Sequence, residues 1–393
     1  MNFLGRFRQK LQRPTAYSLV DIGRDTVKAV VVLAMPDTAT AQVIGYGLAQ
    51  TGGHDVTGGR LEAAAVTQPV NQALSRAEDS TEAVVGQKIV PDEVIFALPG
   101  RAAVGQLFTV RQSRPRPAAP VTAKELRQMT SRAERLARQK LMALPVEGGL
   151  WQPLAVTDAG VYLDDRLALD GIGLTGGELE MSVFGVAALA GALRALELLA
   201  RRLDLTLLNV VSTWQALAAT VPYAEAIVLD IGFAGTDVCL IRHDALVAAG
   251  WIPFGGDLFT QTLAEALNFE PVEVKDLKLA WANGDLEQRE ADYLEAYLSP
   301  ACARWYNALM SLLTSMAGDK PLPWRIYVTG GGSLLPGLEA LLRADSAAFN
   351  RAPEISRLGL RLPFIVKDLT EGLDYNSFAV ALSLTAGLPV SAP

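Results

Sequence analysis

The chain has 393 residues, more than one hydrophobic core usually covers, so several domains or a two-lobed fold are expected. Half of its residues are hydrophobic and a fifth are charged, which excludes a disordered chain. The net charge of −7 argues against nucleic acid as a partner. With two cysteines and two histidines, neither a disulfide framework nor a histidine-based metal site is expected.

Residues 1–16 form a basic segment with an amphipathic pattern. Its apolar residues share one helical face and its cations lie mostly on the others; these are Phe3, Leu4, Phe7 and Leu11, and Arg6, Arg8 and Lys10. Such a segment can lie in a bilayer interface. The alternatives are a partner helix, an arm packed on its own domain, or a disordered tail. No membrane span or signal peptide is evident, so we expect a cytoplasmic protein, peripheral at the inner face of the cell membrane.

Residues 17–90 begin a first lobe. A strand runs into Asp21-Ile22-Gly23 and a short turn, and a second strand returns to residue 33. A strand at 41–48 and a helix at 61–77 follow.

Residues 91–186 have the pattern of a smaller α+β module. Strands are predicted at 94–98, 104–110, 161–163, 167–169 and 178–186. A proline-rich loop precedes the helix at 123–141, which has Thr122 as its N-cap and Glu125 as the capping-box partner. The first lobe then ends over 187–225, with helices at 187–203 and 212–221 around a strand at 205–211.

Residues 226–393 form the predicted second lobe, which opens by repeating the first hairpin. A strand ends in Asp230-Ile231-Gly232, the small-residue turn 233–235 follows, and strands at 236–242 and 246–252 complete a meander. A helical subdomain over 260–320 is predicted from helices at 260–267, 272–281, 288–298 and 301–316. A strand then leads into the glycine turn 330–333, which opens a helix at Leu335; a strand at 362–366 and a helix at 376–387 close the lobe.

These turns suit phosphate chemistry. Glycine lets backbone N–H groups approach an anion, and a nearby aspartate can hold a cation or a metal-bound water. One such turn is equally explained by a tight hairpin that needs glycine. The second copy at Asp230 and the glycine turn at 330–333 favour a nucleotide cleft.

The three turns resemble those of the actin-like ATPases, and residues 18–388 resemble the FtsA/PilM branch of that superfamily. The resemblance implies an α/β, actin-like two-lobed fold of duplicated ribonuclease-H-like domains with an inserted SHS2-type subdomain. Residues 93–100, 161–164 and 173–180 resemble the SHS2 domain of FtsA, and 252–257 with Thr260 resembles another stretch of this branch.

The resemblance also implies ATP and Mg²⁺ as cofactors, with Asp21 and Asp230 holding the metal through water. It assigns cofactor binding to Asp21, Gly23, Arg24, Lys28, Asp230, Gly232, Gly235, Thr236, Asp237, Gly256, Gly330, Gly331, Gly332 and Ser333.

Three departures from the family pattern weaken the case for catalysis. Arg24 replaces a small residue, where it either grips phosphate or obstructs the loop. Residues 233–235 read Phe-Ala-Gly where Gly-Gly-Thr is typical, and Thr213 replaces the acid that positions the attacking water. Gln215 is a weak candidate for orienting that water. We therefore expect ATP binding, with hydrolysis weak or absent.

Four functions remain open. The first is an FtsA-like division adaptor that self-assembles at the inner membrane and links a tubulin-like filament to it. The second is a PilM-like cytoplasmic component of a type IV pilus or secretion system, whose module and neighbouring lobe hold a peptide of an inner-membrane protein. A nucleotide-free scaffold is a variant of both. A sugar-kinase-like phosphotransferase, with Asp237 or Asp257 as its catalytic residue, is disfavoured by the SHS2-like insertion.

Overall fold

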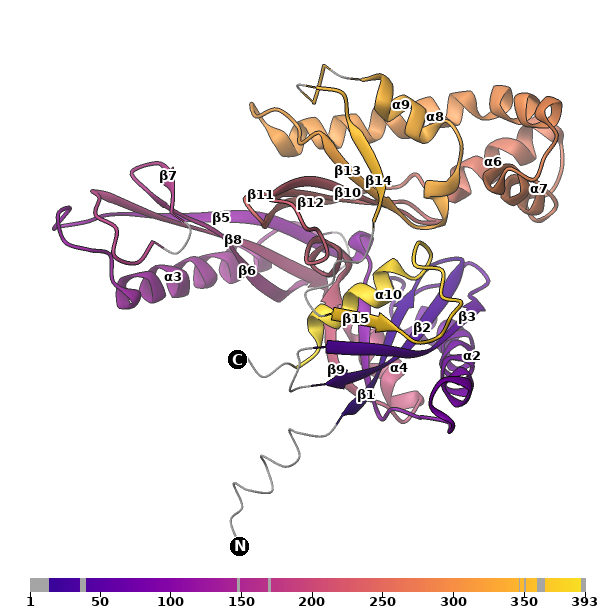
Figure 1. Cartoon of the computed structure of the whole chain (residues 1–393), viewed down its shortest axis with the longest axis horizontal. Coiled ribbons are helices and arrows are strands. Elements are labelled where there is room, and N and C mark those ends of the chain that lie inside the picture. The colour runs from indigo at the N-terminus through magenta and orange to yellow at the C-terminus, as the bar shows by residue number, and fades with distance from the viewer. Residues whose placement is uncertain are drawn as a thin grey trace, which may run out of the picture.

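The computed structural model describes residues 14–35, 40–146, 149–168, 171–345, 347–349, 351–358 and 365–389. Two lobes are each built on a mixed sheet, and a smaller module extends from them to one side (Figure 1). The predicted segment 1–16 lies outside the described residues up to position 13, so its membrane-binding role stays a prediction. Among the described helices, none is long and apolar enough to cross a membrane.

The first lobe is a six-stranded sheet in the order β15-β3-β2-β1-β4-β9. Its strands are β1 (Thr15–Ile22), β2 (Thr26–Met35), β3 (Thr40–Gln50), β4 (Glu93–Leu98), β9 (Thr206–Ser212) and β15 (Ile365–Asp368). Alternate residues of β1 enter different cores, because successive strand side chains point to opposite faces. Val20 joins the cluster under α2 (Arg60–Val85) and α4 (Ala190–Arg202), whereas Leu19 joins the cluster under α5 (Thr213–Ala218) and α10 (Ala379–Ser383).

The second lobe repeats this topology around the order β12-β11-β10-β13-β14. Its elements are β10 (Glu225–Ile231), β11 (Thr236–Arg242), β12 (Ala245–Ile252), α6 (Gly256–Leu267), α7 (Pro271–Asn283), α8 (Gln288–Ala317), β13 (Arg325–Thr329), η3 (Gly331–Leu334), α9 (Leu338–Ala344) and β14 (Glu354–Arg357). In each lobe an antiparallel meander is followed by a strand that pairs in parallel with its first strand: β4 with β1, and β13 with β10. The lobes are therefore copies of one plan.

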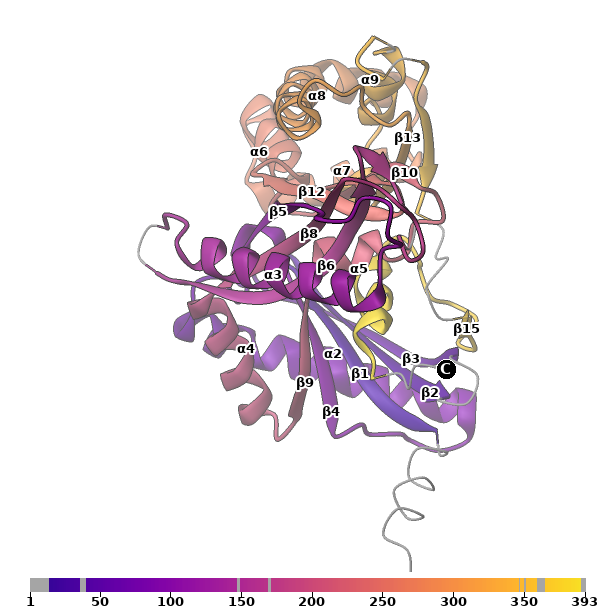
Figure 2. The same ribbon diagram turned by 90° about the vertical axis from the view of Figure 1, so that its left-hand side faces the viewer.

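The module is a four-stranded sheet covered by one helix. Its elements are η2 (Gly100–Ala102), β5 (Ala103–Ser113), α3 (Ala123–Met142), β6 (Trp151–Leu163), β7 (Arg166–Leu167) and β8 (Glu178–Leu189), with strand order β5-β8-β6-β7. Thr122 caps α3 by accepting the Glu125 N–H at 3.2 Å, which confirms the predicted N-cap. Strand β5 packs against β12 of the second lobe (Figure 2).

Two predicted domain boundaries are wrong. Strand β4, assigned to the module from residue 91, pairs with β1 and β9 inside the first-lobe sheet, so the module begins after Leu98. Residues 365–389 were assigned to the second lobe, but β15 pairs with β3 and α10 packs on β1 and β2. The chain thus returns to the first lobe at its C-terminal end, because the open edge of β3 and the apolar face beside β1 accept it.

Three helices near proline or glycine residues begin or end at other positions than predicted. Helix α8 runs unbroken through Pro300, because one buried stripe, including Leu298, Ala301 and Trp305, spans the proline and outweighs its missing N–H. Helix α9 begins at Leu338 instead of Leu335, after the turn at Gly337, whose φ of +87° is left-handed. The last predicted helix is α10 followed by the 3₁₀ turn η4 (Leu384–Gly387).

The close contact of β3 with α2 depends on glycine. A Cβ at Gly47 would lie 2.2 Å from the Ala73 carbonyl oxygen in α2. We expect Gly47→Ala to lower the free energy of unfolding by about 1–3 kcal/mol, measured by urea denaturation. In the control, Gly191→Ala, the new methyl meets no described atom within 4 Å, and removing a helical glycine should raise stability by about 0.5–1 kcal/mol. Equal effects at the two positions would contradict this account.

Candidate functional site

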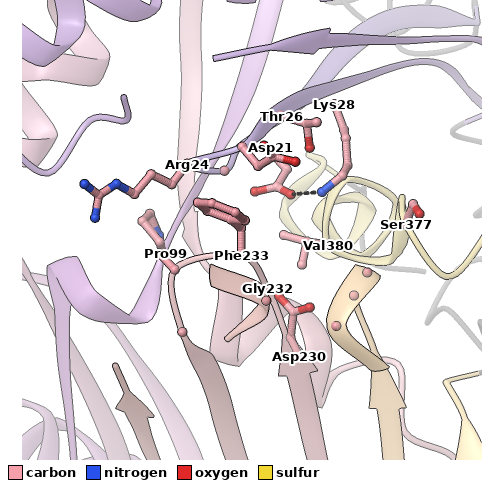
Figure 3. Close-up of a pocket in the computed structure, with 18 of the residues that line it drawn as sticks. Asp21, Arg24, Thr26, Lys28, Pro99, Asp230, Gly232, Phe233, Ser377 and Val380 are labelled. Atoms are coloured by element: carbon pink, nitrogen blue, oxygen red, sulfur yellow. Dashed lines mark ion pairs between the residues drawn. The ribbon is translucent and has the colours of Figure 1, made fainter. Parts of the chain in front are cut away.

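A cavity of about 280 Å³ lies between the two lobes, where the three predicted turns meet (Figure 3). Twelve of the fourteen predicted cofactor-binding residues line it. They are Asp21, Gly23, Arg24, Lys28, Asp230, Gly232, Gly235, Asp237, Gly256, Gly330, Gly331 and Gly332. The fold therefore gathers residues that are more than 300 positions apart in the sequence.

The two hairpins place carboxylates at matching positions. Asp21 faces Lys28 across the β1–β2 pair, and Asp230 faces Asp237 across β10–β11. The Lys28 Nζ lies 3.6 Å from Asp21 Oδ2, so the first lobe presents an ion pair. The second lobe presents two like charges in register, an arrangement that is unfavourable unless a proton or a cation neutralises it.

Asp230 lines the cavity at the end of β10. Burial, and then the charge of Asp21, raise the pKa of Asp230 to about 6, against the opposing effect of Lys28. The described residues contain no cluster of three or more carboxylate, histidine or cysteine side chains that could hold a metal ion directly. A Mg²⁺ here would therefore need water and phosphate oxygens beside Asp21 and Asp230, which is how this ion is usually held at nucleotide sites.

The glycines of the third turn let it close onto the end of β10. At Gly330, where φ is +82°, a Cβ would lie 2.4 Å from Asp230 Oδ1, and at Gly332 it would lie 2.5 Å from the Ile231 side chain. At Gly331 a Cβ would meet no described atom within 4 Å. Gly330 and Gly332 thus allow the turn to pack closely on β10, whereas Gly331 leaves its backbone open to the cavity.

Three predicted residues lie outside the cavity lining. Thr236 donates its hydroxyl to the Phe254 carbonyl at 2.8 Å and accepts from the Trp305 indole at 2.9 Å, which is a structural role. Ser333 donates to the Gly330 carbonyl at 2.6 Å and so holds the turn. Gln215, the weak candidate for orienting water, also lies outside the lining.

Asp237 connects the cavity to the rest of the molecule. Its Oδ1 accepts the Trp214 indole N–H at 2.7 Å, and it also accepts the Gly100 backbone N–H. Burial and then the charge of Asp230 raise the pKa of Asp237 to about 8, against the opposing effect of these hydrogen bonds. The burial of Asp237 therefore favours its protonated, neutral form.

Helix α7 supplies two cations that the sequence analysis did not assign. Lys278 is buried, and its Nζ donates to the Gly256 carbonyl at 2.9 Å and to the Thr260 hydroxyl at 2.6 Å; burial lowers its pKa to about 8. Lys275 reaches across the cleft to Asp25 of the first hairpin at 2.7 Å. Their spacing of three residues places both lysines on one helix face.

The other unpredicted lining residues come from both lobes. Arg101 pairs with the buried Asp55, and burial followed by repulsion from Arg24 lowers the pKa of Arg101 to about 10. The remaining polar ones at the Gly330 turn are Asn376 and Ser377. Asn376 Nδ2 donates to the Gly330 carbonyl at 3.1 Å, so the returning C-terminal segment completes the site.

The second hairpin turn is fixed in place by α6. The Gly256 N–H donates to the Gly232 carbonyl at 2.8 Å, and the Asp257 N–H donates to the Phe233 carbonyl at 2.9 Å. The Phe233 ring enters the cavity, with the Lys278 Nζ 5.9 Å from its centroid. This turn therefore presents an aromatic ring where the family pattern has glycine.

The raised pKa of Asp237 predicts how stability depends on pH. Between about pH 4 and pH 8 the unfolded chain releases this proton while the folded chain keeps it, so this group makes stability fall as pH rises. In Asp237→Asn, which keeps an acceptor for Trp214, the free energy of unfolding should fall less between pH 5 and pH 8 than in the wild type. Urea denaturation at both values measures this, with the exposed Asp276→Asn as control. An unchanged pH dependence would show that Asp237 is ionised.

This chain is similar to known proteins in both sequence and structure. No family model matches the chain. The cell division protein FtsA of Pseudomonas aeruginosa is 24% identical over 226 residues, which is 51% of this chain and 52% of FtsA. The chain thus spans about half the length of this curated relative.

Solved structures match over nearly the whole chain. A PilM–PilN type IV pilus biogenesis complex matches with a TM-score of 0.66 and 20% identity, covering 94% of this chain and 98% of that one. The ethanolamine utilization protein EutJ of Carboxydothermus hydrogenoformans matches with a TM-score of 0.51 and 12% identity, over 95% and 89% of the two chains. The chain has the two-lobed fold of the actin-like ATPases, as predicted, and its similarities lie in the FtsA/PilM branch of that superfamily.

Proposed function

We propose that this protein is a nucleotide-binding scaffold that binds an adenine nucleotide with Mg²⁺ between its lobes and holds a membrane-protein partner on its inserted module. One observation carries the nucleotide part. The Asp21–Lys28 ion pair, Asp230 and the open backbone at Gly331 converge on a single cavity from three separate turns. Carboxylates, a lysine and glycine backbone are what a phosphate chain with a divalent cation requires.

Each part of the cavity has a role in this proposal. Lys28 would neutralise phosphate, and Asp21 with Asp230 would orient the waters around Mg²⁺, which itself supplies charge neutralisation. The turn at 330–332, with Asn376 and Ser377, would hold the nucleoside.

The hydrolytic machinery is poorly developed. The Thr213 hydroxyl, at the position of the family's acid, donates to the Leu98 carbonyl at 3.1 Å and is therefore already engaged. Asp237 accepts the Trp214 indole N–H, and burial favours its protonated form, which cannot take up a further proton as a general base. Binding would then serve assembly and domain position, with little turnover.

The proposed partner is inferred from the structural similarity to PilM. The PilM match covers both lobes and the module, whereas the FtsA similarity covers half of the chain. We therefore favour a cytoplasmic component of a type IV pilus or secretion system that holds a PilN-like protein. A division adaptor is the second candidate, supported by the sequence similarity to FtsA.

Nucleotide binding predicts a rise in melting temperature. A ligand that binds only the folded state stabilises it, by about 2.7 kcal/mol at a hundredfold excess over Kd. Mg²⁺ with ATP or ADP should therefore raise the melting temperature measured by scanning fluorimetry. Asp21→Asn and Asp230→Asn should remove most of the rise, whereas Asp257→Asn, outside the cavity lining, should retain it. No rise with either nucleotide at millimolar concentration would overturn the proposal.

The partner proposal predicts selective capture. The immobilised full chain should retain the cytoplasmic segment of a pilus inner-membrane protein from the same organism in a pull-down assay. A purified tubulin-like division protein from that organism should pass through. Retention of the division protein alone would reject the pilus assignment in favour of the second candidate.

A further inference from the structure

We propose that this cavity selects a nucleoside diphosphate over the triphosphate, because the Phe233 side chain occupies the place where a terminal phosphate would bind. The inference rests on the proposed nucleotide-binding function and specifies its ligand.

The cavity has two distinguishable ends. In Figure 3, Ser377 lies at one end and Arg24 and Pro99 at the other, with the Asp21–Lys28 pair, Val380 and Asp230 between them. The turn at 330–332 packs against the end of β10, and its Gly330 carbonyl accepts the side-chain amide of Asn376, the neighbour of Ser377. A nucleoside held there would direct its phosphates past Lys28 toward Arg24, so each added phosphate lies closer to that second end.

Phe233 lies toward this second end. Its ring stands between Asp21 and Pro99 in Figure 3, on the side of Arg24. The backbone that carries it is fixed, because the carbonyls of Gly232 and Phe233 accept hydrogen bonds from the first residues of α6. A shift of the loop that would withdraw the ring must break both bonds. The ring is therefore a built part of the cavity wall.

The cations near this end are already engaged. Arg24 donates its Nε to the Gly53 carbonyl at 2.9 Å, and its guanidinium points away from Lys28 in Figure 3. Arg101 pairs with Asp55, and Lys275 pairs with Asp25. Lys278, whose Nζ lies 5.9 Å from the Phe233 ring centroid, donates to the Gly256 carbonyl and the Thr260 hydroxyl. Each of these cations thus already donates to a protein acceptor, and a terminal phosphate would meet an apolar ring between them.

The free-energy cost of burying the phosphates therefore differs between a nucleoside diphosphate and a triphosphate. Lys28 and a Mg²⁺ ion near Asp21 and Asp230 can compensate two phosphates in the middle of the cavity. A third phosphate would have to lose water against the Phe233 ring and draw Arg24 or Lys278 away from its present acceptor, and burying a poorly compensated charge is costly. Replacing the ring by hydrogen opens that space and leaves the turn with a glycine, the residue typical of this fold.

The test measures the affinities of the full chain for ADP and ATP, each with Mg²⁺, by isothermal titration calorimetry. In the wild type we expect ADP to bind at least about tenfold more tightly than ATP, or about 1.4 kcal/mol. Phe233→Gly should tighten ATP binding about tenfold and change ADP binding by less than about threefold, so that the preference disappears. Phe233→Ser serves as a second variant, and unliganded melting curves confirm that both fold.

Phe254→Ala is the matched control, because Phe254 is a nearby aromatic that packs in the second-lobe core under Arg304 and does not line the cavity. It should leave the ratio of the two affinities unchanged. Equal or tighter binding of ATP by the wild type, or an unchanged ratio in both Phe233 variants, would overturn this inference and leave nucleotide binding intact. Absence of binding for both nucleotides in wild type and variants would overturn the proposed function as well.

Discussion

A single buried carboxyl joins the three parts of this molecule. Asp237 belongs to the second lobe, its indole donor Trp214 begins the connecting helix of the first lobe, and Gly100 opens the module. A Cβ at Gly100 would lie 1.8 Å from Asp237 Oδ1, so only glycine allows the contact. The Trp214 ring also contacts the position of Gly105 in β5, at 3.3 Å from its notional Cβ. Because the lobes and the module meet here, the protonation state of this one group affects how all three are held.

Comparison of the two hairpins helps to explain why the pKa of that carboxyl is raised. In each hairpin an aspartate near the end of the first strand faces an ionisable residue seven positions later: Lys28 in the first lobe and Asp237 in the second. The first pair neutralises itself, whereas the second cannot do so without a proton or a cation. A cation between the lobes would favour the ionised form of Asp237, because an opposite charge nearby lowers the pKa of an acid. A ligand that brings a cation into the cavity would thereby act on the junction with the module.

Several of the charged side chains that line the cavity already neutralise one another in ion pairs. Lys28, Lys275 and Arg101 each pair with a carboxylate, and the Lys275 pair with Asp25 spans the cleft. A nucleotide must therefore compete with existing pairs, which favours ligands whose charge stays near the centre. The ring of Phe233 acts in the same direction at the far end. Retention of the binding turns beside this obstructed end is the arrangement expected of a scaffold that holds a nucleotide without turning it over.

Local sequence determined the parts of this structure that depend on neighbours in the chain. The apolar runs that lead into Asp21 and Asp230, with glycine two positions on, predict both hairpins, which the structure confirms. Thr122 with Glu125 defines the start of α3. Repetition of these local patterns, together with the resemblance to the actin-like ATPases, was enough to predict the duplicated lobes and twelve of the residues that line the cavity, because each pattern encodes its own turn.

Only the tertiary structure decided which distant segments meet. Parallel pairing carries no local pattern, so the assignment of β4 to the first-lobe sheet and the return of β15 to β3 could not be inferred. The passage of α8 through Pro300 depends on a buried stripe whose partners lie elsewhere in the lobe. Lys275 and Lys278 belong to the cavity because α7 packs over it. The physical reason is the same in each case: these contacts gain their free energy from burial and charge pairing between segments that are far apart in the chain.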